Sequence, residues 1–250
     1  MNEKTEYDNI NIIGNNWEDD YNDSVKVFNQ YDKESRERIA SKFLADAAKK
    51  ERILDLGCSF GAWCPSLQAL GFSNIVGIDI SKERLKIAAK RGYTEVLVAN
   101  GANLPFQAES FGTIICIDVL VHVMQREDWK RIFKEAHRVL KQGGYFVFSI
   151  VNEKGNNINN FIRLPVKLLK MMIGKKEAEI DYCTFSTIAE ISALMKDAGF
   201  AIEDIEGQRF SYPDKLIYFP SVLHFLDKLF GRTFLKDYAR VLFFKTRKIS

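Results

Sequence analysis

The stretch ILDLGCSFG, residues 53–61, reads as a short apolar strand that runs directly into a turn containing two glycines, Gly57 and Gly61. A second apolar segment, residues 74–79, ends in Asp79, which follows Gly57 by 22 residues. Glycines let a backbone approach a ligand closely, and a carboxylate after the second strand can accept hydrogen bonds from two ribose hydroxyls. The pairing predicts a site for a ligand that contains a nucleoside.

The glycine spacing is not that of a dinucleotide-binding turn. Such a turn reads GxGxxG and places a pyrophosphate at the N-terminus of a helix. Here only Cys-Ser-Phe separates Gly57 from Gly61, and Asp55 adds a carboxylate two residues before the first glycine. A carboxylate at that position repels phosphates but tolerates a cation. We therefore expect a nucleoside ligand that carries positive charge.

Composition indicates one domain with a full hydrophobic core and room for insertions. The chain has 250 residues, of which 46% are hydrophobic, and a formal net charge of +3. Its four cysteines and three histidines include no CxxC pair and do not cluster, so no metal site is expected. The basic residues form no dense stripe along the sequence, so nucleic acid is not an expected partner.

The N-terminus is acidic and rich in asparagine rather than basic and then apolar, so it does not read as a signal peptide. No apolar run approaches the roughly 20 residues that a membrane span requires. Cys58 and Cys116 lie at the ends of apolar strands, where reduced thiols pack well. These features lead us to expect a soluble, cytoplasmic protein.

Hydrophobic periodicity predicts alternating strands and helices after residue 50, preceded by one or two amphipathic helices within residues 24–50. The predicted helices are 62–70, 82–91, 126–140 and 187–198, and the strands after the first are 74–79, 94–98, 112–118, 144–151, 200–205 and 240–246. Such alternation is typical of a parallel sheet covered on both faces. We expect an α/β, Rossmann-like fold with seven mostly parallel strands, the last of them antiparallel, and helical insertions near the C-terminus.

Five ordered segments resemble the motifs of class I S-adenosylmethionine-dependent methyltransferases, within the group of small-molecule and quinone-biosynthesis enzymes. They are residues 53–61, Asp79, residues 100–106 (NGANLPF), residues 110–123 and residues 137–144 (HRVLKQGG). The family's first motif reads acidic-x-Gly-x-Gly-x-Gly, and its middle glycine is Ser59 here. The resemblance covers roughly residues 50–151 and implies S-adenosyl-L-methionine as the cofactor.

The resemblance also implies a role for each matching residue. Asp79 would bind the ribose hydroxyls, Asn100 would accept from the adenine amino group, and the Gly101 N–H would face the adenine ring. Asp55 would contact the amino group of the cofactor, and the remaining cofactor-binding positions are Gly57, Gly61, Ile80, Ala102 and Ile117. Other interpretations remain open: Asp79 caps the following helix, Asn100 only shapes its turn, and Asp55 only holds the glycine turn.

The resemblance implies methyl transfer to a small or lipid-like acceptor by in-line displacement. His122 is the candidate general base, because the turn after the fourth strand faces the reacting methyl group in this fold; alternatively, His122 only packs or caps the next segment. Asp118 is either a substrate-side carboxylate or a cap for that turn. The rival functions are an RNA or protein methyltransferase and a non-catalytic cofactor-binding subunit, with a nicotinamide dehydrogenase as a more distant alternative.

We expect one domain in four parts: a helical cap (1–50), a cofactor-binding core (51–151) and two insertions, 152–185 and 207–238, that form a lid over the acceptor. The first insertion carries Arg163, Lys167 and Lys170 along one face of an apolar helix, and the second is also rich in apolar residues. Such helices suit a lid or a peripheral contact with a membrane surface. Alternatively, the insertions pack on each other or form a subunit interface.

Overall fold

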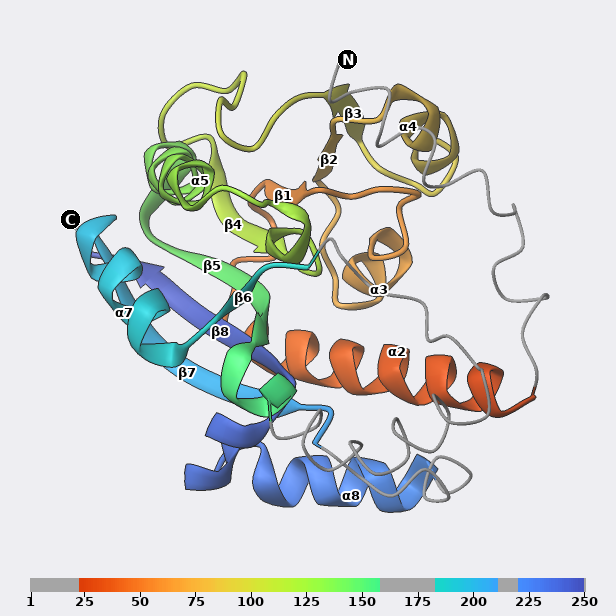
Figure 1. The fold of residues 1–250 in the computed structure, drawn as a ribbon. Coiled ribbons are helices and arrows are strands. Elements are labelled where there is room, and N and C mark those ends of the chain that lie inside the picture. The colour runs from red at the N-terminus through yellow and green to blue at the C-terminus, as the bar shows by residue number, and fades with distance from the viewer. Residues whose placement is uncertain (1–22, 158–182, 211–219, 250) are drawn as a thin grey trace, which may run out of the picture.

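A computed structural model describes residues 23–157, 183–210 and 220–249 (Figure 1). Residues 1–22, most of the first predicted insertion (158–182) and residues 211–219 lie outside the described residues. The predicted basic stripe of Arg163, Lys167 and Lys170 therefore lies outside the described residues. No helix in the described ranges is long and apolar enough to cross a membrane.

The described chain alternates strands and helices from residue 53 onward, as the periodicity predicts. A long helix, α2 (Asp23–Phe43), comes first, so the predicted amphipathic region forms one helix. The core then runs β1 (Ile53–Leu56), α3 (Cys64–Ala69), β2 (Ile75–Asp79), α4 (Lys82–Ala88), β3 (Glu95–Val98), β4 (Phe111–Cys116), η1 (Leu120–His122), α5 (Arg126–Val139) and β5 (Leu140–Asn152). The C-terminal part contains β6 (Phe185–Ser186), α7 (Ile188–Asp197), β7 (Phe200–Gln208), α8 (Pro220–Phe230), η3 (Phe234–Tyr238) and β8 (Val241–Lys248).

These strands form one sheet in the order β3-β2-β1-β4-β5-β8-β7, with the short β6 paired to the end of β5. Strands β1 to β5 are parallel, and β8 lies antiparallel between β5 and β7. The predicted mostly parallel sheet with a reversed last strand is confirmed, and β6 is an addition that the sequence did not reveal. The chain leaves β3 at one edge and returns to β4 on the far side of β1, which makes the β1–β4 boundary a topological switch point.

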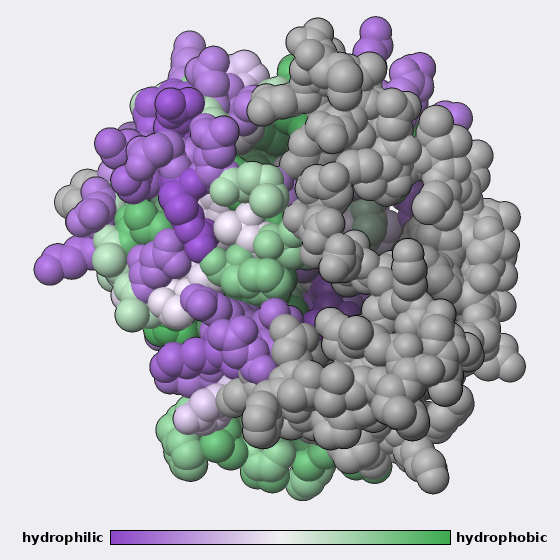
Figure 2. All heavy atoms as spheres, in the orientation of Figure 1, coloured by the Kyte–Doolittle hydropathy of each residue, from purple (hydrophilic) through white to green (hydrophobic). Residues whose placement is uncertain are grey.

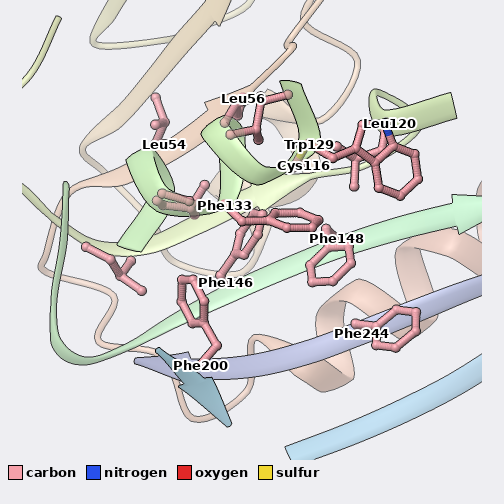
Figure 3. Close-up of a cluster of buried hydrophobic side chains, with 14 of the residues drawn as sticks. Leu54, Leu56, Cys116, Leu120, Trp129, Phe133, Phe146, Phe148, Phe200 and Phe244 are labelled. Carbon is pink, nitrogen blue, oxygen red and sulfur yellow. The ribbon is translucent and has the colours of Figure 1, made fainter. Parts of the chain in front are cut away.

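Alternate residues of each central strand pack on opposite faces of the sheet. One face carries Leu54, Leu56, Ile114, Phe146, Phe148 and Phe244 under helices α5 and α7, and the other carries Ile53, Ile115, Val147 and Phe243 under α2 and α3. Figure 3 shows the aromatic part of the first face, where Phe133 of α5 points at Phe146 and Phe148 of β5. A parallel sheet that is apolar on both faces needs helices on both, which is why residues 62–70 and 126–140 had to be amphipathic.

Helices α2 and α8 lie side by side at the β7 end of the molecule (Figure 1). The hydroxyl groups of Tyr31 and Ser35 in α2 donate to the buried carboxylate of Asp227 in α8. His224 of α8 packs its ring 5.0 Å from that of Tyr31, measured between ring centroids. The part of the second predicted insertion that is described is therefore joined to the N-terminal helix by buried polar contacts, and its role as an acceptor lid stays a prediction.

Candidate functional site

The loops that follow β1, β2, β3 and β4 carry almost all of the predicted site residues. Because these four strands are parallel neighbours, their carboxyl ends lie along one edge of the sheet. In such sheets ligands bind outside the carboxyl ends of the strands, at the switch point. The structure therefore brings residues 55–61, 79–80, 100–102 and 117–122 to the edge where a nucleoside site was predicted.

The turn after β1 depends on the missing side chain of Gly57. The residue has φ +79°, and a Cβ atom added there would lie 2.3 Å from Cγ2 of Val119, which follows β4. The N–H groups of Gly57 and Cys58 both donate to the carbonyl of Ile78 at 2.8 Å. The first glycine therefore lets the loop after β1 fit between the ends of β2 and β4.

The same turn has two more residues in the left-handed region, Ser59 with φ +49° and Gly61 with φ +81°. A Cβ on Gly61 would lie 2.9 Å from Cε2 of Tyr93, so this position also excludes a side chain. Ser59 occupies the place of the family's middle glycine, and a left-handed conformation costs an L-residue roughly 1–2 kcal/mol. The departure at Ser59 thus places a residue with a Cβ atom in a conformation that favours glycine.

Asp79 joins the two loops that would face a nucleoside. Its Oδ2 accepts the N–H of Ser59 at 2.9 Å, and its Oδ1 accepts the N–H of Ser81 at 2.9 Å. Ser81 in turn caps the N-terminus of α4, so the cap that Asp79 was alternatively expected to provide comes from its neighbour. Each carboxylate oxygen keeps a second lone pair, which leaves this buried carboxylate able to accept from a ribose.

The loop after β3 lies against the end of β2. The Ala99 N–H donates to the Asp79 carbonyl at 3.1 Å, and a Cβ on Gly101 would lie 3.0 Å from Leu56 Cδ2. The Oδ1 of Asn100 accepts the Ala102 N–H at 2.9 Å, so this side chain does shape its own turn. The second lone pair of that oxygen keeps the predicted contact with adenine open.

Ile80, which directly follows Asp79, has an exposed side chain. Ala102 is half-buried against the core, and Ile117 is buried on the α2 and α3 face. Of these three apolar positions, Ile80 therefore offers a ligand the most accessible surface.

Asp55 is buried beneath the glycine turn, and Tyr93, just before β3, donates its hydroxyl proton to Asp55 Oδ2 at 2.5 Å. Burial raises the pKa of Asp55 from 3.8 to about 7; the Tyr93 hydrogen bond lowers it, and the charge of Asp79 raises it. The carboxyl group is therefore partly protonated near neutral pH.

The segment after β4 connects the site to α2. The carboxylate of Asp118 forms an ion pair with Arg36, which also contacts Asp32 at 2.7 Å. Asp118 has φ +59°, and its N–H donates to the Ser149 hydroxyl at 2.9 Å. Neither predicted role for Asp118 describes this arrangement, since its carboxylate binds the N-terminal helix.

His122 ends η1 and has an exposed side chain. Desolvation by the surrounding protein lowers its pKa, and the positive charge of Arg84 lowers it further. Arg84 itself lies over the ring of Phe60, 5.6 Å from the ring centroid. His122, the start of α4 and the glycine turn therefore share one environment, in which the imidazole is mostly neutral at pH 7.

Three residues at this edge were not predicted from the sequence: Tyr93, Arg36 and Val119. Each matters through a partner distant in the chain, and no local pattern marks it. For Tyr93 the only available signal was an aromatic residue next to Gly92 at the entry to a strand, which is common in buried sheets.

The charge at this edge suits a cationic nucleoside. In the described part of the chain, Asp55 and Asp79 accept hydrogen bonds from Tyr93, Ser59 and Ser81, and neither carboxylate forms an ion pair. Nor does that part of the chain contain a group of His, Cys, Asp and Glu side chains that could hold a metal ion. Two buried carboxylates beside a turn that excludes side chains fit a ligand with a sugar and a positive charge.

Comparison with known proteins points in the same direction. The family described as "Methyltransferase domain" matches residues 54–148. An uncharacterized protein of Methanocaldococcus jannaschii is 33% identical over 70% of this chain and 82% of its own length. The solved structure of an S-adenosylmethionine-dependent methyltransferase from Methanosarcina mazei is similar with a TM-score of 0.59, at 22% identity, over 84% of this chain and 97% of that one.

Two further relatives have named acceptors. A ubiquinone biosynthesis O-methyltransferase of Paraburkholderia phymatum is 24% identical over 63% of this chain and 67% of its own length. A tRNA (carboxymethyluridine(34)-5-O)-methyltransferase of Arabidopsis thaliana is 34% identical over 43% of this chain but only 26% of its own length.

The buried Asp55 makes stability depend on pH. Its folded-state pKa is raised from 3.8 to about 7, so the folded protein keeps a proton that the unfolded chain has lost across this interval. The stabilisation that Asp55 contributes by holding this proton is complete below pH 3.8 and is lost progressively as the pH rises to about 7. We expect Asp55→Asn to raise the free energy of unfolding by about 2 kcal/mol at pH 8 and to change it little below pH ~4.

Urea unfolding at several pH values measures this effect, with Asp197→Asn, an exposed carboxylate at the end of α7, as the matched control. If the free energies of unfolding of Asp55→Asn and the natural protein differ by the same amount at every pH, the raised pKa of Asp55 is contradicted.

Proposed function

This chain belongs to the class I S-adenosylmethionine-dependent methyltransferases, and we propose that its acceptor is a small or lipid-like molecule. The observation that carries the proposal is the extent of the likeness. Similarity to the ubiquinone biosynthesis enzyme covers 67% of that relative, whereas similarity to the tRNA enzyme covers 26% of that one. Acceptor choice resides outside the shared cofactor core, so the longer likeness is the more informative one.

Two of the cations near the site are already paired with carboxylates. Arg36 is bound by Asp32 and Asp118, and Arg209 contacts Asp32 at 3.0 Å. A protein that binds RNA needs cations that can exchange counterions for backbone phosphates. The guanidinium groups of Arg36 and Arg209 already have carboxylate partners.

For the cofactor, we assign Asp79 to the ribose hydroxyls, and Asn100, Gly101 and Ile80 to the adenine. Asp55 lies under the glycine turn, where its negative charge would stabilise the positive end of the ligand. When bound, S-adenosylmethionine supplies an electrophilic methyl group, so the enzyme mainly has to align the acceptor and exclude water. Because the preformed turn has no side chains at Gly57 and Gly61, its backbone could approach the ligand closely.

His122 would take the proton that an acceptor hydroxyl or acidic carbon loses as it attacks. Its lowered pKa keeps the imidazole neutral near pH 7, which is the form that can accept a proton. For an acceptor that is already a neutral amine or an anion, this step is unnecessary.

The acceptor class can be tested directly. The purified protein is incubated with methyl-labelled cofactor and fractions of a cell extract, and the label is followed into solvent-extractable molecules, RNA and protein. We expect label in the small or lipid-soluble fraction. Label confined to RNA or protein would support the rival acceptors, and an absence of label from all fractions would support a non-catalytic subunit.

Asp79→Ala should weaken cofactor binding at least about 100-fold, since two hydrogen bonds to a charged carboxylate contribute roughly 1.5–3 kcal/mol each. Calorimetric titration with S-adenosylhomocysteine measures the loss. Glu83→Ala, which removes an exposed carboxylate of α4, is the control and should bind normally. Circular dichroism shows whether the Asp79 variant is folded; a folded variant with natural affinity would end the assignment.

His122→Ala should slow turnover about 10²-fold or more for an acceptor that must lose a proton, while cofactor affinity stays unchanged. Because its pKa is lowered, the natural enzyme should keep its activity as the pH falls toward 6.5 and lose it only below. Rates measured as a function of pH should show this acidic decline in the natural protein and not in the variant. Equal rates for both proteins would limit His122 to packing.

A further inference from the structure

Helix α8 has one face that is firmly attached to the rest of the protein. Leu223 is buried on this face, and the buried Asp227 accepts hydrogen bonds from Tyr31 and Ser35 of α2. Phe230 packs edge-on against Phe210, with 5.9 Å between the ring centroids. These contacts hold the helix on the surface of α2 and β7, so they also decide which of its residues point outward.

The outward face of α8 is apolar as well, and η3 extends it. Val222, Phe225 and Leu229 follow helical spacing, and together with Phe234 and Tyr238 they form what we call the α8–η3 surface. Their exposed fractions are 41%, 63%, 49%, 81% and 45% in that order. Of the nine exposed large hydrophobic residues in the described ranges, five belong to this surface. Figure 2 shows hydrophobic residues along the lower edge of the molecule, where Figure 1 places α8.

The inner side of α8 is buried against the protein, and its outer side is also apolar. An exposed apolar surface of this kind indicates a contact with a partner. The charges around the α8–η3 surface indicate what covers it. Lys228 and Arg232 are exposed beside it and Lys236 is half-buried, whereas its acidic residues are the buried Asp227 and the half-buried Asp237. Two carboxylates from other elements lie beside the surface: Asp204 of β7 contacts Arg232 at 3.4 Å, and Glu34 of α2 contacts His224 of α8 at 3.0 Å. Within residues 221–238 the exposed charged side chains are the two cations Lys228 and Arg232, so the surface combines exposed aromatic and aliphatic side chains with cations at its rim.

We propose that the α8–η3 surface docks on a bilayer that contains anionic phospholipids. Aromatic and aliphatic side chains on one side of a surface helix enter the boundary between headgroups and acyl chains, and flanking cations bind acidic headgroups. A second copy of this chain fits the surface less well, because a twofold dimer would place the cationic rims of the two copies against each other. The inference concerns a face distinct from the cofactor site and does not depend on the acceptor.

Vesicle co-sedimentation of the full-length protein tests the proposal. We expect it to bind vesicles of phosphatidylcholine mixed with phosphatidylglycerol at least tenfold more tightly than phosphatidylcholine alone, and to dissociate as salt increases. The double variant Phe225→Asp, Leu229→Asp should lose at least tenfold in vesicle binding. Lys228→Glu with Arg232→Glu should lose the preference for the anionic vesicles.

Ile249→Asp is the matched control, because it places the same charge on an exposed hydrophobic residue outside the surface. It should bind vesicles like the natural protein. All variants should bind S-adenosylhomocysteine with natural affinity, which shows that they are folded. The proposal is overturned if the natural protein stays in the supernatant, if the double variant binds as tightly as the control, or if light scattering finds a dimer that the double variant dissociates.

Discussion

The architecture of the site depends on one carboxylate that holds two backbones. Asp79 accepts the Ser59 N–H with one oxygen and the Ser81 N–H with the other, so the turn after β1 and the start of α4 share an anchor. The Ile78 carbonyl adds two bonds from Gly57 and Cys58 to the same turn. A turn with three left-handed residues would be unstable alone, and these bonds fix it before any ligand arrives. A carboxylate already held in place loses little freedom on binding.

A second set of ionic contacts joins α2 to the sheet. Glu206 of β7 is fully buried and binds Arg38 at 2.6 Å and Lys42 at 2.5 Å, and Arg36 reaches Asp118 after β4. Because Glu206 is buried, it would carry an uncompensated charge if both Arg38 and Lys42 were removed, and such a charge is strongly destabilising. Asp118 lies four residues before His122, so this ion pair attaches the N-terminal helix to the segment that carries the candidate base.

Local patterns predicted the elements and the loops, and they did not predict the contacts between distant segments. Strand alternation, the glycine turn and Asp79 are encoded within a few residues, and Asn100 can shape its turn for the same local reason. Tyr93 and Asp55 are 38 residues apart, and Tyr31 and Asp227 are 196 apart. Such pairs form because the sheet order brings their elements together, and neither residue carries a local mark of its partner. For the same reason the sequence indicated apolar helices near the C-terminus without indicating which faces they would expose.

The position of Asp55 is best understood from the cost of its charge. The other residues of β1 are apolar, and a buried apolar residue would suit the sheet better than a carboxyl group beside a second carboxylate. Tyr93 satisfies one oxygen, but a hydrogen bond does not neutralise the charge. A cation placed above the turn would favour the ionised form of Asp55 and offset its desolvation. Functional sites often keep such locally unfavourable groups, and the fold that holds them supplies the stability they lack. The positive ligand charge predicted from the spacing of Asp55 and Gly57 would offset the negative charge of these two buried carboxylates.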